Sequence, residues 1–208
     1  MTPIGTEAAV ALRYPVMEHF YTLQGEGAWT GTAAYFIRLG GCDVGCHWCD
    51  VKESWDAEAH PPLSVAALLE AVAATPAERV VLTGGEPLMH NCQPLTGHLR
   101  AAGLKLHVET SGAHPPSGTF DWVCLSPKKF KPALPAFYPL ADELKVVVNH
   151  PSDLAWAEEH AARCPGTTQC FLQPQWFRPE SMGWIVDYVK AHPHWRVSLQ
   201  THKYLEIP

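Results

Sequence analysis

Short apolar runs recur along the chain, each rich in Val, Leu, Phe or Tyr and each ending near Gly, Pro, Ser or Thr. Runs of this length and composition predict buried β-strands rather than helices. The predicted strands cover residues 35–40, 79–84, 105–110, 121–126, 143–148, 169–174 and 196–201.

Helix-like segments separate some of these strands. Residues 64–74 begin with Ser64 in an N-cap position and consist mostly of strong helix formers. Residues 93–103 end with a glycine in the position that commonly follows a helix. Residues 152–164 and 179–192 have a similar character, so the pattern predicts four helices.

The order of strands and helices predicts an α/β fold, because strands that alternate with helices form parallel sheets with crossover connections. Residues 111–120 and 127–141 are too rich in Pro and Gly for a helix, so helices should be fewer than strands. A complete eight-fold barrel needs about 250 residues, more than the 208 present. We therefore expect a partial, open (β/α) barrel in a single domain, 1–208, with a short N-terminal extension of about residues 1–14.

Composition and charge narrow the possible partners. The chain has 15 Lys and Arg against 21 Asp and Glu, a net charge of −6, so we expect no nucleic-acid partner. No apolar run approaches the roughly 18 residues of a membrane span, and the N-terminus has no secretion-signal pattern. We expect a cytoplasmic protein without a membrane partner.

Three of the seven cysteines lie close together in the segment CDVGCHWC, directly after the first predicted strand. Cys42, Cys46 and Cys49 are thiol ligands on a short glycine-containing loop, which suits an iron–sulfur cluster with one iron left open to a ligand. A zinc site that uses His47 as the fourth ligand is an alternative, but four ligands within so short a segment make a poor tetrahedron. Three inert buried cysteines are the other alternative.

The remaining cysteines are Cys92, Cys124, Cys164 and Cys170, and we expect all four to be core or incidental residues. A second motif, TGGEP, follows the next predicted strand, at residues 83–87. Paired glycines allow the backbone to approach a ligand closely, although many such turns have no function. Both motifs should open onto the carboxyl edge of the sheet, where active sites of such folds lie.

The chain resembles the radical S-adenosylmethionine (radical SAM) superfamily in CDVGCHWC and TGGEP. Further segments resemble the 7-carboxy-7-deazaguanine synthase (QueE) family within it. They are FYTLQGEG (20–27), YFIRLGGC (35–42), VETSG (108–112), SPK (126–128), LQPQ (172–175) and LQTHKYLEIP (199–208). This resemblance runs from about residue 17 to the chain end.

The resemblance implies a lyase of queuosine and 7-deazapurine biosynthesis. Its cofactors would be a [4Fe–4S] cluster and S-adenosylmethionine (SAM). A 5′-deoxyadenosyl radical would take a hydrogen from C6 of 6-carboxy-5,6,7,8-tetrahydropterin, after which the ring contracts and ammonia leaves. The resemblance also implies an electron donor such as flavodoxin or ferredoxin, and a homodimer.

The resemblance assigns roles residue by residue. Cys42, Cys46 and Cys49 would hold the cluster. The SAM-binding residues would be Gly85, Glu109, Ser126, Pro127, Lys128, Gln173 and Pro174. The substrate-binding residues would be Leu23, Gln24, Gly25, Glu26, Arg38, Thr83, His202 and Pro208.

Simple chemistry supports part of the substrate set. A pterin edge presents adjacent N–H donors, which suit Gln24 and Glu26. Arg38 could bind the substrate carboxylate in a bidentate manner, although an ion pair at a strand end is its ordinary role. Glu109 could equally be a strand-end cap or an ion-pair partner.

One position departs from the family pattern. Family members commonly carry Thr or Ser after the Cys-Asp pair, and its hydroxyl ligates Mg²⁺; here that residue is Val51. Asp50, Glu53 or Ser54 could replace the missing oxygen, and the sequence does not choose among them. Mg²⁺ use is therefore open.

Two rival functions fit parts of the sequence. Another small radical SAM enzyme, such as a glycyl-radical activase, would share the cysteine and TGGEP motifs but would not need LQGEG or QTHKYL. An electron-transfer or scaffolding module would normally have a fourth protein ligand, and no fourth cysteine lies nearby.

Overall fold

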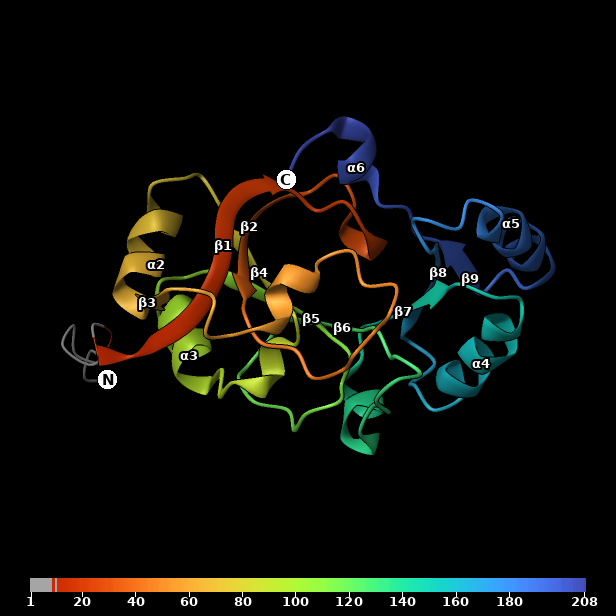
Figure 1. Cartoon of the computed structure of the whole chain (residues 1–208), viewed down its shortest axis with the longest axis horizontal. Helices are drawn as coiled ribbons and strands as arrows, with labels where there is room; N and C mark the ends of the chain where they lie inside the picture. The colour runs from red at the N-terminus through yellow and green to blue at the C-terminus, as the bar shows by residue number, and fades with distance from the viewer. Residues whose placement is uncertain (1–8, 10) are drawn as a thin grey trace.

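The computed structural model describes residue 9 and residues 11–208, and its framework is one nine-stranded sheet (Figure 1). The strand order is β3–β1–β2–β4–β5–β6–β7–β8–β9, so the sheet is open between β3 and β9. The strands are β1 (Arg13–Leu23), β2 (Ala33–Leu39), β3 (Pro62–Ser64), β4 (Arg79–Gly84), β5 (Lys105–Thr110), β6 (Trp122–Leu125), β7 (Glu143–Val148), β8 (Gln169–Pro174) and β9 (Trp195–Val197).

The prediction of a partial, open α/β barrel is confirmed, and the predicted parallel strands form its larger part. From β2 through β4 to β9, all neighbouring strands pair in parallel. Two strands at one end of the sheet, β1 and β3, were not predicted: β1 pairs antiparallel with both β2 and β3. Their sequences carry polar residues and prolines among the apolar ones, and therefore lack the continuous apolar run of a buried parallel strand.

Helices are fewer than strands, as expected. The α-helices are α2 (Val65–Ala73), α3 (Gln93–Ala101), α4 (Ser152–Ala161), α5 (Ser181–Ala191) and α6 (Thr201–Leu205). Short 3₁₀ turns are η1 (Gly27–Trp29), η2 (Lys52–Trp55), η3 (Pro87–Met89) and η4 (Pro135–Leu140). Four α-helices match the predicted segments, and Ser64 caps α2 by accepting a hydrogen bond from the Ala67 amide at 3.2 Å.

The expected N-terminal extension of about residues 1–14 lies mostly outside the described residues and stays a prediction; β1 begins at Arg13. One expectation about the other end of the chain needs correction. The predicted strand 196–201 is shorter than expected. Strand β9 ends at Val197, and α6 begins at Thr201.

The core lies between the sheet and the surrounding helices. Leu144, Val146 and Val148 of β7 are fully buried, as is Leu172 of β8. Their neighbours Glu143 and Lys145 are also buried, although they are charged. Charged side chains inside a parallel sheet are rare unless they are paired, so they mark the site described below.

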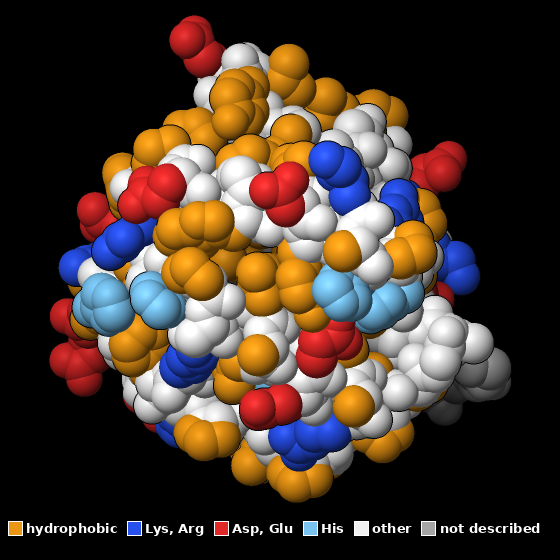
Figure 2. Space-filling view, turned by 90° about the vertical axis from the view of Figure 1, so that its right-hand side faces the viewer, with side chains coloured by type: hydrophobic (Ala, Val, Ile, Leu, Met, Phe, Trp, Pro, Cys, Tyr) orange, Lys and Arg blue, Asp and Glu red, His pale blue; other side chains and the backbone are white. Residues whose placement is uncertain are grey.

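The surface carries charges of both signs. Figure 2 shows, on the side of α4 and α5, lysines and arginines interspersed with acidic and hydrophobic side chains rather than gathered into one field. Among the described residues, none of the helices combines the length and apolar character required to traverse a bilayer.

Candidate active site

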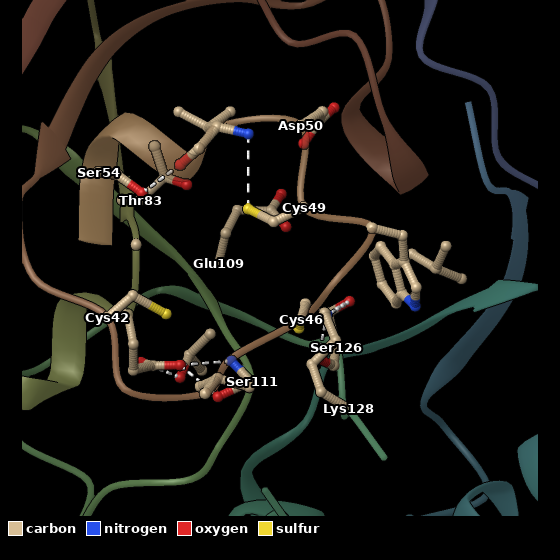
Figure 3. A pocket seen from close by; sticks show the side chains of 18 of the residues that line it. Cys42, Cys46, Cys49, Asp50, Ser54, Thr83, Glu109, Ser111, Ser126 and Lys128 are labelled. Atoms are coloured by element: carbon tan, nitrogen blue, oxygen red, sulfur yellow. Dashed lines mark hydrogen bonds between the residues drawn. The ribbon is translucent and has the colours of Figure 1, made fainter. Parts of the chain in front are cut away.

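The cysteine loop follows β2 and crosses the carboxyl edge of the sheet. Cys42, Cys46 and Cys49 line one cavity, and Figure 3 shows their sulfur atoms facing the same hollow. The backbone amide of Val51 donates a hydrogen bond to the Cys49 sulfur at 3.4 Å. Apolar neighbours, including Val44 and Ala113, pack around the loop.

The three thiols fit an iron–sulfur cluster better than a single ion. All seven cysteines are free, and within the described part of the chain no three His, Cys, Asp or Glu side chains converge on one ion position. Burial raises the pKa of Cys46 to about 11 and also raises the pKa of Cys42. Metal binding must therefore displace the thiol protons, as is usual for thiolate ligands.

His47, the fourth ligand of the alternative zinc site, lies away from the three thiols. His47 is exposed, does not line the cavity of the three thiols, and packs edge-on against the Phe130 ring with 5.1 Å between ring centroids.

The other four cysteines line neither this cavity nor the adjoining one described below. Cys92, Cys124 and Cys170 are buried, and Cys164 packs against the main core, as expected.

The TGGEP turn lies directly against the cysteine loop. The Gly85 amide donates to the Leu39 carbonyl at 3.2 Å, and the Glu86 amide donates to the Gly41 carbonyl at 2.8 Å. A Cβ on Gly85 would lie 2.4 Å from the Gly41 oxygen and 2.7 Å from the Cys42 Cβ. Only glycine permits this approach.

Glu86 of the same turn fastens it to the end of β5. Its buried carboxylate accepts from the Thr110 hydroxyl at 2.6 Å and from the Ser111 amide at 2.8 Å. It also accepts from the Ser111 hydroxyl and, at 3.1 Å, from the Leu88 amide. A buried carboxylate with this many donors is satisfied within the protein, so Glu86 has a structural role.

The first cavity encloses about 1030 Å³ including its open mouth, at the carboxyl edge of the sheet. It contains the three cysteines and nearly every residue assigned to SAM. These are Gly85, Glu109, Ser126, Lys128, Gln173 and Pro174. Pro127 is the exception among them, since it is buried and does not line the cavity.

A second cavity of about 760 Å³ adjoins the first. Its lining contains every residue assigned to the substrate: Leu23, Gln24, Gly25, Glu26, Arg38, Thr83, His202 and Pro208. Glu26, Arg38, Thr83 and Glu109 line both cavities, so ligands in the two spaces would touch common side chains.

The carboxyl-terminal segment and the loop after β1 close the second cavity together. The Thr201 amide and hydroxyl donate to the Gly25 carbonyl at 2.9 and 3.0 Å. A Cβ on Gly25 would lie 2.1 Å from the His202 Nδ1. Close contact between two segments distant in sequence thus shapes this cavity.

A buried ion-pair network joins the two cavities. The Lys145 ammonium lies 2.6 Å from Glu26 Oε2 and 2.6 Å from Glu109 Oε2. The Gln24 amide donates to the other oxygen of Glu109 at 3.2 Å, and the Gln200 amide donates to Glu26 at 3.0 Å. The network fixes the orientation of both carboxylates.

The pKa values of this network follow from its pairing. Burial alone would raise the pKa of Glu26, but the Lys145 charge and the hydrogen bonds from Lys145 and Gln200 lower it to about 2. Burial raises the pKa of Glu143, whose carboxylate accepts from the Ala28 amide at 3.1 Å and from the Trp122 indole at 3.2 Å.

Arg38 forms an ion pair that leaves part of its guanidinium group free. Its Nε donates to Glu18 at 2.6 Å, which is the ordinary ion pair of a strand end. The same side chain lines both cavities, and among the hydrogen bonds of the described residues none engages its terminal Nη nitrogens. Those nitrogens are the ones that a carboxylate ligand needs.

The candidate replacements for the missing hydroxyl at Val51 differ in position. Val51 lines both cavities. Asp50 also lines both, but its Oδ2 accepts from Lys203 at 2.5 Å and from Gln200 at 3.3 Å. Ser54 lines the first cavity and donates to the Val51 carbonyl at 2.7 Å, whereas Glu53 is exposed and lines neither.

Sequence reasoning missed Lys145 and Gln200. A lysine within the apolar run ELKVVV was an available signal, because a charge in a buried strand needs a partner inside the protein. Gln200 lies in the resembling segment LQTHKYLEIP, but its contact with Glu26 joins residues 174 positions apart and has no local signature.

Comparison with known proteins shows which family this chain is similar to. A family model described as "Radical SAM superfamily" matches residues 36–126. A protein of Flavobacterium psychrophilum named 7-carboxy-7-deazaguanine synthase is 55% identical over 93% of this chain and 92% of its own. One of the same name from Synechocystis is 49% identical over 100% of this chain and 99% of its own.

A solved structure has a similar fold. The crystal structure of QueE from Escherichia coli superposes with a TM-score of 0.83 and is 32% identical. The match covers 92% of this chain and 95% of that one.

The low pKa of Glu26 predicts an acid-dependent loss of stability. Since its pKa falls from an ordinary 4.5 to about 2 on folding, its ionisation stabilises the fold above pH 4.5, and this contribution disappears as the pH falls toward 2. Glu26→Gln should lower the free energy of unfolding by about 1–3 kcal/mol at pH 7. Urea titrations from pH 7 to pH 3 should show the difference from wild type shrinking, and a constant difference would contradict this account.

Proposed function

Because the chain belongs to the 7-carboxy-7-deazaguanine synthase family, we propose that it converts 6-carboxy-5,6,7,8-tetrahydropterin to 7-carboxy-7-deazaguanine with loss of ammonia. The radical SAM superfamily implies a [4Fe–4S] cluster and SAM as cofactors. Together they supply, when bound, the radical that removes a hydrogen from the substrate.

One observation supports this proposal most strongly. Two adjoining cavities share Glu26, Arg38 and Glu109, and one is lined by the three cysteines while the other is lined by the segments particular to this family. A radical made in the first space would need its target alongside it, and the shared wall provides that proximity. A glycyl-radical activase would have no use for a second, small-molecule cavity lined by residues 23–26 and the chain end.

The chain's own residues would bind and orient the two ligands. We assign the cluster to Cys42, Cys46 and Cys49. We assign SAM to the first cavity through Gly85, Glu109, Ser126, Lys128, Gln173 and Pro174, with Pro127 supporting Ser126 and Lys128 from behind. The Ser126 carbonyl and hydroxyl hold the Lys128 ammonium at 2.5 and 2.7 Å, which orders this segment.

The second cavity would hold the pterin. Gln24 and Glu26 offer acceptors to its N–H edge, and the free Nη nitrogens of Arg38 offer donors to its carboxylate. Leu23, Gly25 and Thr83 complete the walls. His202 and Pro208 close the cavity from the carboxyl-terminal segment.

We extend the proposal to the electron donor, the oligomeric state, the domain organisation and the cellular compartment. We propose a one-electron donor such as flavodoxin or ferredoxin, a homodimer, and a single domain, the last supported by one sheet that takes strands from residues 13 to 197. Seven free cysteines support a reducing, cytoplasmic compartment.

Anaerobic turnover tests the function directly. Protein with its cluster reconstituted, SAM, dithionite and 6-carboxytetrahydropterin should give 7-carboxy-7-deazaguanine, methionine and 5′-deoxyadenosine, identified by mass spectrometry. SAM cleavage without the deazaguanine product would leave a radical SAM enzyme with another substrate, and would overturn the proposal.

The cluster assignment predicts the effect of cysteine substitutions. Replacing Cys42, Cys46 or Cys49 with Ala should abolish both the cluster and SAM cleavage, because three thiolates are the smallest set that leaves one iron open. Cys170→Ala is the matched control, since that buried thiol lines neither cavity. Iron and sulfide analysis with the visible absorption spectrum measures the outcome, and full iron content in a loop variant would refute the assignment.

The position of Pro208 predicts an asymmetric effect of tags. Pro208 lines the second cavity, and we propose that its terminal carboxylate binds the substrate, so a carboxyl-terminal tag would move the charge away and add bulk there. Substrate affinity should fall roughly ten- to a hundred-fold, the effect of losing one charge-assisted hydrogen bond. An amino-terminal tag of equal length is the control, and equal affinities of the two tagged proteins would exclude this role.

Val51 predicts a weak response to Mg²⁺. An isopropyl group beside both cavities disfavours a hydrated cation, and Asp50 Oδ2 and the Ser54 hydroxyl are already engaged in hydrogen bonds. We propose that activity changes little after chelation and that Val51→Thr gains a response to added Mg²⁺. Activity assays of both proteins with and without Mg²⁺ decide this. Wild-type activity that is lost on chelation and restored by Mg²⁺ would show the interpretation of Val51 to be wrong.

A further inference from the structure

Lys145 is the most deeply buried cation among the described residues of the site. Only 4% of its side chain is exposed, and it projects from β7 into the first cavity. Its ammonium touches one oxygen of Glu26 and one of Glu109, which places these two oxygens no more than about twice 2.6 Å apart. The other oxygen of each carboxylate accepts a hydrogen bond from a glutamine amide.

Two carboxylates this close in a buried site do not both stay ionised without a cation between them. Ionised carboxylates only accept hydrogen bonds, whereas a protonated one carries a hydroxyl that donates. Glu26 and Glu109 therefore present acceptors alone to the two cavities as long as Lys145 lies between them.

We propose that Lys145 is a positioning residue that holds Glu26 and Glu109 together as ionised acceptors for the N–H groups of the pterin and the hydroxyl groups of the SAM ribose. This inference rests on the proposed function. It adds a residue that neither the sequence motifs nor the names of the relatives indicate.

Other groups around the ammonium are consistent with this role. Burial alone would lower the pKa of Lys145, but the acidic groups around it raise it well above its ordinary value. The titratable and charged groups that face it or its two partners are Glu26 before η1, Glu109 on β5, Cys124 on β6, Lys128 after β6, Glu143 on β7, and His202 on α6.

Removing the ammonium should make ligand binding depend on pH. In Lys145→Met the two carboxyls would share a proton at neutral pH, and one acceptor would become a donor. Because the proton leaves as the pH rises, the variant should recover affinity at high pH. His202 titrates in both proteins and interacts with Glu26, so the double variant described below, which keeps both residues, separates its contribution from that of the carboxyl pair.

The experiment is a pair of anaerobic titrations of the holoenzyme with the cluster left oxidised, so that no turnover occurs. Dissociation constants for 6-carboxytetrahydropterin and for SAM are measured separately from pH 6 to pH 9. For Lys145→Met, the affinity for at least one ligand should fall roughly ten- to a hundred-fold at pH 6.5, and the deficit should shrink toward pH 9.

Two further variants separate positioning from a loss of structure. Lys145→Met with Glu109→Gln leaves a single carboxyl, so the excess pH dependence of pterin binding over wild type should disappear. Lys105→Met is the matched control, because that lysine pairs with Asp121 in an exposed position outside both cavities and should bind like wild type. Circular dichroism checks that each variant is folded.

The outcomes distinguish this proposal from the proposed function. If wild type binds both ligands and Lys145→Met binds them equally well, or with a deficit that is constant across the pH range, the positioning role is overturned. If wild type does not bind the pterin at all, the proposed substrate is wrong. SAM binding still tests Lys145 through Glu109 in that case, and a pH-independent SAM affinity deficit, or none, would overturn the role. An unfolded single variant shifts the test to the double variant, whose excess pH dependence, if retained, would also overturn the role.

Discussion

The close approach of two backbone turns is the constraint on which the site depends. The turn after β4 lies against the loop after β2, with Gly84 and Gly85 so near to Leu39, Gly41 and Cys42 that any side chain would collide. Hydrogen bonds from the Gly85 and Glu86 amides fix the contact. Because the cysteine loop begins at this contact, the position of its first thiol is set by backbone geometry rather than by a flexible side chain.

That contact extends across the sheet through buried polar groups. Glu86 carries the constraint from β4 to the end of β5, where Thr110 and Ser111 donate to it. Lys145 on β7 then connects β5 to the loop after β1, because its ammonium pairs with Glu109 on β5 and with Glu26 in that loop. Breaking one member of such a network leaves an unpaired buried charge, so the residues of the site are interdependent and not a set of separate contacts.

The sequence predicted the parallel core of the fold because buried parallel strands are continuous apolar runs. It did not predict the antiparallel strands β1 and β3, whose sequences mix polar residues and prolines with apolar ones. It also extended the strand at residue 196 into what is a turn and a short helix. The local sequence pattern does not predict these segments correctly, because pairing with segments distant in sequence decides their conformation more than local preference does.

In the site, too, residues in short motifs were easier to identify from the sequence than residues whose partners are distant along the chain. Cys42, Cys46, Cys49 and the TGGEP turn were accessible because their chemistry is encoded in short spacings. Lys145 in its apolar run signalled a buried partner, but neither the partners of Lys145 nor the role of Gln200 could be identified, because Glu26 and Glu109 are distant in sequence and only the fold brings them together. Pro127 is a different case, since it is buried and does not line the cavity although it lies inside the predicted binding segment 126–128.

The two cavities also differ in how they are built. The first lies at the ends of central parallel strands, where each side chain is held by neighbours on both sides. The second is closed by the loop after β1 and by the last residues of the chain, joined through Thr201 and Gly25. Peripheral segments tolerate sequence change better than central strands. The architecture therefore builds the cavity of the three cysteines on the central part of the sheet and the second cavity on the part most open to variation, with Glu26 and Glu109 lining both.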